Sequence, residues 1–279
     1  MKKIALLAAS VLMTGSLFAF DNDLLEFKGK AESYTKTEYS VTSRFGEYFR
    51  TVAIKHVHTF ANGLRMETVS YSPKDEVLDS VSYEYTSGGK LSAEISKDAE
   101  GKVTRKLVYE YSADGKIKSE TAYNAADVLT GKNIYKYEAN RTSESLYNAE
   151  GKLVSRVNHI LENGKEIEVA YYFGDGTLSH AEKYSYTDNG DIALIENIDS
   201  DGNKAGKTVY RYDDKGFLSE IQIYASDTDL IERDIYKNDA KGNPTKVSIY
   251  SIAEKFGSTV NELISITDYS YGLSTANAK

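Results

Sequence analysis

Apolar and polar residues alternate along most of this chain with a period of two, which is the pattern of β-strands. Between residues 116 and 123, for example, Ile117, Ser119, Thr121 and Tyr123 share one predicted face, and the residues between them share the other. Side chains of a strand point alternately to opposite faces of the sheet, so this pattern buries one side and exposes the other. We expect strands of about nine residues, or roughly 30 Å.

Turn glycines recur at a spacing of 26 residues. They are Gly63, Gly89 and Gly115 and then, after one shortened interval, Gly164, Gly190, Gly216 and Gly242. A second series of turns lies between them, at residues 99–102, 149–152, 175–176 and 201–202. Asp-Gly and Asn-Gly pairs in these turns supply the positive φ that tight hairpins require. Each 26-residue unit therefore contains two strands and two turns.

This repeat predicts an all-β fold, an antiparallel β-meander of about 17 strands that is built from 26-residue two-strand repeats and forms a single domain. So many twisted strands rarely stay open and flat. The sheet is therefore expected to curl into a barrel or shell with tyrosines inside, to form a curved single layer, or to form an outer-membrane barrel. The predicted segments are a signal peptide (1–19), a lead-in strand or cap (20–45), the repeat domain (46–273) and a frayed C-terminal end (274–279).

The N-terminus has the features of a secretory signal peptide. Lys2 and Lys3 precede an apolar stretch at residues 4–12, and a small and apolar segment at residues 14–19 follows, in which Leu17-Phe18-Ala19 is the expected cleavage site. That apolar stretch is too short to span a bilayer. We therefore expect an exported bacterial protein of the periplasm, the cell surface or the outer membrane.

Composition narrows the choice of function. The net charge is −8, and −10 without Lys2 and Lys3, which argues against a general nucleic-acid binder. The chain has no cysteine, so burial and strand pairing must stabilise the exported protein without disulfides. No segment after the signal peptide has the eighteen or so apolar residues of a transmembrane helix.

Pairs of tyrosines in the pattern Tyr-x-Tyr precede most turn glycines of the first series. One interpretation is that they pack the buried or concave face of the sheet, with hydroxyls reaching water. The other is that they form an exposed stacking ladder for a sugar polymer or a peptide, since a regular array offers regularly spaced contacts. The ten candidate ligand-binding residues are Tyr83, Tyr85, Tyr109, Tyr111, Tyr135, Tyr137, Tyr184, Tyr186, Tyr210 and Tyr212.

Two known types of bacterial repeat share these motifs. The stretch Tyr210-Arg-Tyr-Asp-Asp-Lys-Gly-Phe-Leu218 resembles a YD repeat of the RHS type. The stretch Tyr147-Asn-Ala-Glu-Gly-Lys-Leu153 is similar to MORN-like hairpin repeats. The resemblance covers most of residues 57–245 and implies that the array contacts carbohydrate.

Metal binding is not expected. His56 and His58 lie two apart on one strand face, but a site needs a third ligand, and His159 is about four units away. The run Asp199-Ser-Asp201-Gly-Asn203 resembles the first half of a calcium loop. Lys204 and Tyr210 occupy the positions where such a loop needs glycine and glutamate, so we expect a polar hairpin turn instead.

Catalytic motifs are also missing from the sequence. It has no Gly-x-Ser-x-Gly, His-Glu-x-x-His or phosphate-loop pattern, and its many Glu and Lys residues are typical of cross-strand pairs. We therefore expect no enzyme, no cofactor and no catalytic residue. The favoured function is a non-catalytic binding or structural module of the bacterial envelope, in contact with a polysaccharide or a surface protein. Unpaired first and last strands would allow end-to-end self-association.

Two alternatives stay open. An outer-membrane β-barrel fits the signal peptide and the many strands. Against it, Arg105, Glu182 and Glu196 share a predicted face with apolar neighbours, where a lipid-facing band should be apolar. A carbohydrate-active enzyme is the other alternative.

Overall fold

The computed structural model describes residues 31–255 and 257–273, and all regular secondary structure in this part of the chain is β. The odd-numbered strands are β1 (Ala31–Arg44), β3 (Leu64–Tyr71), β5 (Leu91–Asp98), β7 (Ile117–Asn124), β9 (Arg141–Asn148), β11 (Lys165–Phe173), β13 (Ile192–Ile198), β15 (Leu218–Tyr224) and β17 (Pro244–Lys255). The even-numbered strands are β2 (Glu47–Ala61), β4 (Val77–Tyr85), β6 (Val103–Tyr111), β8 (Leu129–Glu138), β10 (Leu153–Glu162), β12 (Leu178–Tyr186), β14 (Lys204–Tyr212), β16 (Leu230–Asn238) and β18 (Ser258–Leu273). The described residues form no helix, and therefore none that could span a membrane.

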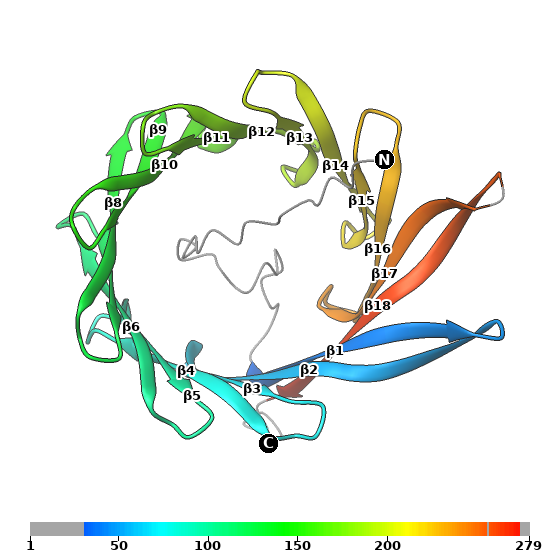
Figure 1. The fold of residues 1–279 in the computed structure, drawn as a ribbon, viewed down its shortest axis with the longest axis horizontal. Coiled ribbons are helices and arrows are strands. Elements are labelled where there is room, and N and C mark those ends of the chain that lie inside the picture. The colour runs from blue at the N-terminus through cyan, green and yellow to red at the C-terminus, as the bar shows by residue number, and fades with distance from the viewer. Residues whose placement is uncertain (1–30, 256, 274–279) are drawn as a thin grey trace.

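The sheet closes on itself. Each strand pairs antiparallel with its neighbours in sequence, and β1 also pairs with β18, so the 18 strands form one barrel (Figure 1). This confirms the all-β meander and decides in favour of a barrel over a curved open layer. The prediction that the first and last strands are unpaired is wrong, because Tyr34 of β1 faces Tyr271 of β18 in a continuous ladder.

The N-terminal lead-in contributes a strand to the wall. β1 pairs with β2 as well as with β18, so residues 31–44 are an integral part of the barrel. The predicted signal peptide at residues 1–19, residues 20–30 and the C-terminal residues 274–279 lie outside the described part of the chain.

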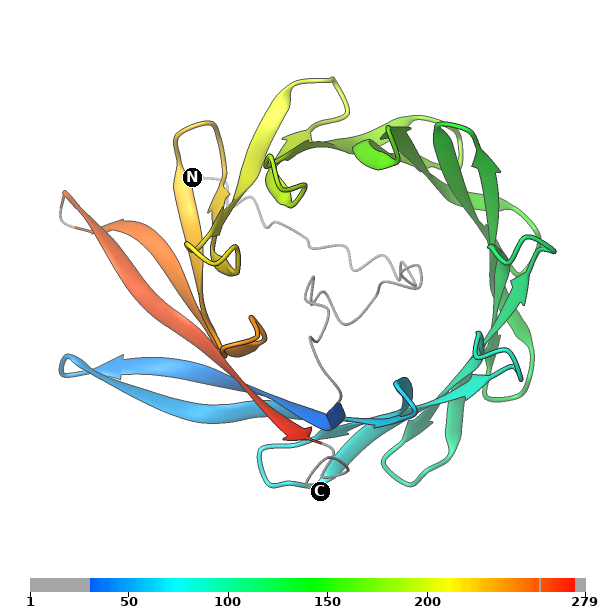
Figure 2. The same ribbon diagram turned by 180° about the vertical axis from the view of Figure 1, so that it is seen from behind.

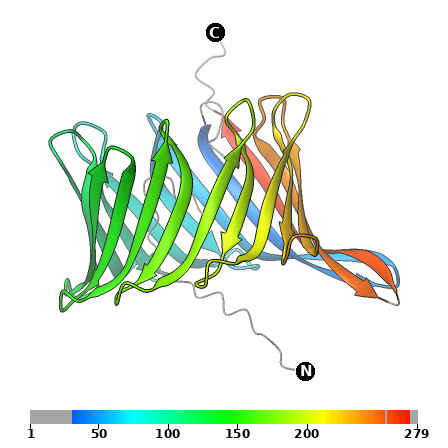
Figure 3. The same cartoon turned by 90° about the horizontal axis from the view of Figure 1, so that it is seen from above.

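The barrel has two rims (Figure 3). We call the rim with the turns from even to odd strands the upper rim, and the rim with the turns from odd to even strands the lower rim. All seven glycines of the 26-residue series lie at the upper rim with φ between 77° and 93°, which confirms their predicted role in turns. In a typical turn the Gly115 amide donates to the Ser112 carbonyl at 2.9 Å, and the Ser112 amide donates to Lys116 at 2.9 Å.

β-bulges beside the turns change the simple alternation of faces. In the β6–β7 ladder Glu110 faces Ser119, but the next pair is Tyr111 and Ile117, so Lys118 is an extra residue. Ile117 consequently packs with Leu107, Tyr109 and Tyr111. The prediction that Ile117 shares a face with Ser119 is therefore wrong.

The same hairpin motif faces inward at one rim and outward at the other. At the upper rim Tyr111 and Ile117 pack into an inner cluster. At the lower rim Tyr172 and Leu178 pair in the same way, but they pack with Ala170 and Ala181 on the outer surface. A half-turn about an axis that lies in the sheet and runs perpendicular to the strands converts a hairpin at one rim into a hairpin at the other. The same rotation exchanges the inner and outer faces of the sheet. A hairpin of fixed hand must therefore expose opposite sides at the two rims.

Candidate functional site: the inner face of the barrel

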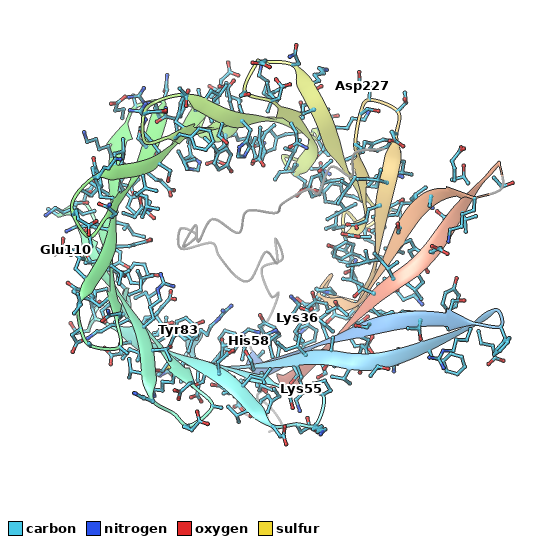
Figure 4. All side chains as sticks on the ribbon, viewed as in Figure 1. Lys36, Lys55, His58, Tyr83, Glu110 and Asp227 are labelled. Atoms are coloured by element: carbon cyan, nitrogen blue, oxygen red, sulfur yellow. The ribbon has the colours of Figure 1, made fainter. Side chains whose placement is uncertain are left out.

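The ten predicted tyrosines all lie on the inner face of the upper half of the wall. They come in pairs from β4, β6, β8, β12 and β14, and Figure 4 shows Tyr83 on the inner side. Their cross-strand partners place the other pairs on the same face, as Tyr83 faces Glu94 and Tyr109 faces Glu120. The fold thus brings the pairs onto one surface, in two groups separated by His159 of β10.

The second tyrosine of a pair links successive upper-rim hairpins. In four of the five pairs its hydroxyl donates to a backbone carbonyl twenty residues earlier, at the start of the neighbouring strand. These bonds run from Tyr85 to Arg65 (2.6 Å), Tyr111 to Leu91 (2.7 Å), Tyr186 to Glu166 (2.6 Å) and Tyr212 to Ile192 (2.7 Å). Burial raises the pKa of all four phenols, which stay protonated and able to donate. These tyrosines are held in fixed positions.

In β6 and β8 the first tyrosine of the pair bonds a glutamate fifteen residues earlier, whereas Tyr184 of β12 donates to Glu182 of its own strand at 2.6 Å. The Tyr109 hydroxyl donates to Glu94 at 2.6 Å, and the Tyr135 hydroxyl donates to Glu120 at 2.8 Å. Burial, with the nearby carboxylates, raises the pKa of both phenols well above the ordinary value. Glu120 is 1% exposed, so its carboxylate is buried in the wall, where it accepts the hydrogen bond from Tyr135.

Sequence reasoning missed these carboxylates. Glu94, Glu120 and Glu144 occupy equivalent places in successive odd strands and lie 26 and 24 residues apart. The repeat that revealed the tyrosines therefore also contained the signal for their partners.

His159 occupies a tyrosine position and carries charge. Its Nδ1 lies 2.7 Å from Oε1 of Glu166, and its Nε2 lies 3.2 Å from Oε1 of Glu144. Burial opposes protonation, but the hydrogen bonds to the two glutamates raise the pKa of His159 to about 9. At neutral pH the imidazolium therefore joins two carboxylates of the inner wall. Nearby, the exposed ring of His180 stacks on Tyr171 at 4.2 Å.

The other histidines do not converge with His159. The rings of His56 and His58 lie 6.4 Å apart on β2, while His159 lies on β10, across the barrel in Figure 1. Nδ1 of His56 bonds Ser70, and the ring of His58 stacks on a tyrosine of β1. Residues 31–255 and 257–273 contain no cluster of three or more His, Asp or Glu side chains suited to a metal ion.

The calcium-like run forms a hairpin turn. Oδ1 of Asp199 accepts the backbone N–H of Asp201 at 3.0 Å and of Asn203 at 2.8 Å. These bonds, above all that from Asn203, lower the pKa of the Asp199 carboxyl. The carboxylate thus stabilises the turn, as the sequence predicts.

The inner wall has a carboxylate side and an aliphatic side. The aliphatic side follows Tyr184, Tyr210 and Tyr236. The residues fifteen positions before these tyrosines are Val169, Ile195 and Ile221, where the carboxylate side has glutamate. Asp234 of β16 lies between Ile221 and Ile249 on this aliphatic side, and its Oδ1 is buried without a hydrogen-bond partner. Burial, with a smaller contribution from Glu232, raises the pKa of Asp234 to about 6.

We expect Asp234→Asn to stabilise the protein at neutral pH. Folding raises the pKa of this carboxyl, so the folded state binds the proton more tightly than the unfolded state does. This stabilisation of the folded state is complete below the unfolded pKa, and it is lost as pH rises through about 6. The variant should therefore gain about 1–2 kcal/mol near pH 8 and nothing near pH 4. Urea unfolding at both pH values measures the difference. Asp227→Asn, in an exposed turn, is the control, and an equal gain at both pH values would contradict the assignment.

Carboxylates outnumber cations on the inner face. Figure 4 shows Lys36 and His58 on the inner side and Lys55 and Glu110 on the outer side, and the described side chains leave the centre of the ring open. The inward carboxylates include Glu38, Asp79, Glu94, Glu120, Glu144, Glu166, Glu182, Glu232 and Asp234, and the inward cations include Lys36, Arg65, Arg105 and His159. This surface offers aromatic rings and hydrogen-bond acceptors to a ligand.

Comparison with known proteins gives no family. Neither a protein-family model nor a curated protein matches the sequence, so the YD-like and MORN-like resemblance stays a resemblance of motifs. Among solved structures, a porin-like protein from Bacteroides uniformis is similar at 9% identity and a TM-score of 0.45, over 86% of this chain and 97% of that one. The TcdB2-TccC3-Cdc42 structure is similar at 12% identity and a TM-score of 0.28, over 78% of this chain and 16% of that one. Similarities this low carry no argument about function.

Proposed function

We propose that this protein is an exported bacterial envelope barrel that binds an elongated carbohydrate along its inner face without catalysis. The observation that supports this is the concentration of tyrosines and carboxylates on that face. Sugar rings present apolar C–H faces that stack on aromatic rings, and their hydroxyls donate to carboxylates. A wall that repeats the same contacts from strand to strand suits a ligand that repeats as well.

The outer wall supports a location in water. Across β11 to β14 the outward side chains Glu168, Lys183, Glu196 and Lys207 face one another in turn. A lipid-facing band is apolar, because each charge near the middle of a bilayer costs about 2–4 kcal/mol. Of the charges that the sequence suggested for this face, Glu196 does point outward, whereas Arg105 and Glu182 point inward.

An outer-membrane β-barrel is the second candidate. The observation that favours it is the closure of the sheet into a barrel. A wall that crosses a bilayer must pair every strand edge, which only a closed barrel achieves. The pairing of β1 with β18 meets this requirement over Ala31–Ser40. In this role the inner face would line a pore.

Solubility separates the two candidates. We expect the chain from residue 20 onward to stay monodisperse in buffer without detergent, because its outer wall is charged. Aggregation that only detergent reverses would favour the membrane candidate and contradict our proposal.

Binding is tested by affinity electrophoresis in gels that contain soluble envelope polysaccharides or peptidoglycan fragments. Tyr137→Ser should weaken retardation about fivefold, since Tyr137 is 39% exposed on the inner face and one ring contact contributes about 1 kcal/mol. Tyr147→Ser, which removes a ring from the outer face, is the matched control. No retardation by any of these polymers would leave only a structural role.

A further inference from the structure

Two hairpins at the seam of the barrel are longer than the others. β1, β2, β17 and β18 have 14, 15, 12 and 16 residues, whereas the other strands have 7 to 10. The pairing of β1 with β18 ends at Ser40 and Ser265. Beyond this point the two hairpins separate and project outward at the lower rim, on one side of the barrel (Figures 1, 2 and 3).

The turn of the β1–β2 hairpin places a phenylalanine where asparagine is usual. Phe45 has φ 54° and Gly46 has φ 81°. The Asn62-Gly63 and Asn163-Gly164 turns have almost the same values, with φ of 53° and 51° at asparagine and 80° at both glycines. Asparagine tolerates this left-handed conformation, whereas a bulky side chain costs about 1 kcal/mol there. The Phe45 side chain is nevertheless fully exposed, so packing against the described residues does not offset this cost.

The surroundings of Phe45 are aromatic and carry charges of both signs. Tyr48 is 55% exposed and Phe49 is 50% exposed, and as neighbours on one strand they project from opposite faces of the ribbon. Arg44 and Glu47 are exposed and face each other across the ladder, while Arg50 pairs with Asp268 at 2.8 Å. Four of the other lower-rim turns carry acidic and no basic side chains, at residues 125–128, 174–177, 199–203 and 225–229.

We propose that the tip of the β1–β2 hairpin, residues 44–50, inserts into the headgroup region of a lipid bilayer and anchors the barrel at a membrane surface. The rings lie on both faces of a narrow projecting ribbon. A flat protein surface could cover only one face, whereas lipid surrounds the tip. Aromatic rings favour the bilayer interface, and they rather than charge drive the insertion, because Glu47 faces Arg44 and Asp268 pairs with Arg50. This anchor does not depend on what the inner face binds.

The absence of tryptophan from the sequence gives a direct test. In Phe45→Trp the indole is the only one in the protein, so its fluorescence reports on residue 45 alone. We expect a blue shift when vesicles of equal parts phosphatidylethanolamine and phosphatidylglycerol are added, and none without vesicles. Emission that stays that of a water-exposed indole at saturating lipid would overturn the proposal.

Phe45→Asn separates anchoring from folding. Asparagine suits the turn, so the variant should unfold at the same or a higher urea concentration than the wild type. Its partition to the same vesicles in co-sedimentation should fall about tenfold or more, as expected for loss of one buried phenylalanine. Phe173→Ser, which removes a ring of 55% exposure at the end of β11, is the matched control and should bind as the wild type does.

Two results would contradict the lipid anchor. One is unchanged partitioning of Phe45→Asn. The other is a wild type that ignores vesicles but self-associates in sedimentation velocity in a way that Phe45→Asn abolishes, which would make the tip a contact between copies. Failure of polysaccharide binding would leave the anchor untouched, since these measurements use lipid only.

Discussion

Replacing Gly206 by alanine is expected to destabilise the barrel by about 3 kcal/mol or more, a large part of the roughly 5–15 kcal/mol by which a typical protein is stable. Gly206 lies in β14 with φ 132°, a conformation that L-residues rarely adopt. A Cβ there would also lie 2.5 Å from the carbonyl oxygen of Tyr224 in the neighbouring strand. Backbone of a paired strand cannot move aside as a flexible side chain can. Urea unfolding followed by circular dichroism measures the loss.

Gly202→Ala is the matched control for Gly206. Gly202 has φ 85° in a lower-rim turn, and nothing lies within 4 Å of the position its Cβ would take. Its substitution therefore introduces strain without a clash and should cost about 1 kcal/mol. Equal losses in the two variants would show that the contact with Tyr224 has no energetic weight.

The elements of this fold follow from local sequence because each hairpin is a local structure. Alternating residues determine the strands, and glycines such as Gly115 supply positive φ at the turns. The bulges are less visible, since an extra residue such as Lys118 looks like any other polar residue. One bulge is enough to turn Ile117 to the other face, so the predicted faces fail beside the turns while they hold in the middle of the strands.

Closure of the barrel is not a local property. It depends on the pairing of Tyr39 with Ile266, residues more than two hundred positions apart, of which Tyr39 lies before the predicted repeat domain. Nothing in the spacing of the glycines marks these strands as partners. The sequence indicates that the sheet must curl, but the summed twist and stagger of all strands decide whether the ends meet.

The tyrosine positions could be predicted, but the interactions of their hydroxyls could not. A phenol that donates to a carbonyl twenty residues away, as Tyr186 does to Glu166, requires the strand register to be known. The fifteen-residue spacing between Glu94 and Tyr109 is visible in the sequence once the cross-strand contact has been seen. These hydrogen bonds show that the wall fixes the positions of the tyrosine hydroxyls. Ligand binding by the faces of the tyrosine rings stays a prediction.

The two kinds of tyrosine should differ in their contribution to stability. Tyr135→Phe removes the hydroxyl that donates to Glu120, a carboxylate that is 1% exposed, and is expected to cost about 2–3 kcal/mol. Tyr111→Phe removes a bond to the neutral carbonyl of Leu91 at a half-buried site and should cost only about 1 kcal/mol. Urea unfolding of the two variants, in which the same atom is deleted, provides the comparison.

A second substitution tests whether charge causes this difference. The hypothesis is that Tyr135→Phe is costly because the buried carboxylate of Glu120 loses a hydrogen-bond donor. The double variant Tyr135→Phe/Glu120→Gln should then recover part of the lost stability, since a neutral amide is less costly to bury than a carboxylate. Glu94→Gln, at the equivalent position fifteen residues before Tyr109, leaves the Tyr135 contact intact and should give no recovery when combined with Tyr135→Phe. Equal losses for Tyr135→Phe and Tyr111→Phe, without recovery by Glu120→Gln, would mean that the inner carboxylates are incidental to the wall. Recovery specific to Glu120 would establish the tyrosine–carboxylate pair as the structural unit that repeats around this side of the barrel.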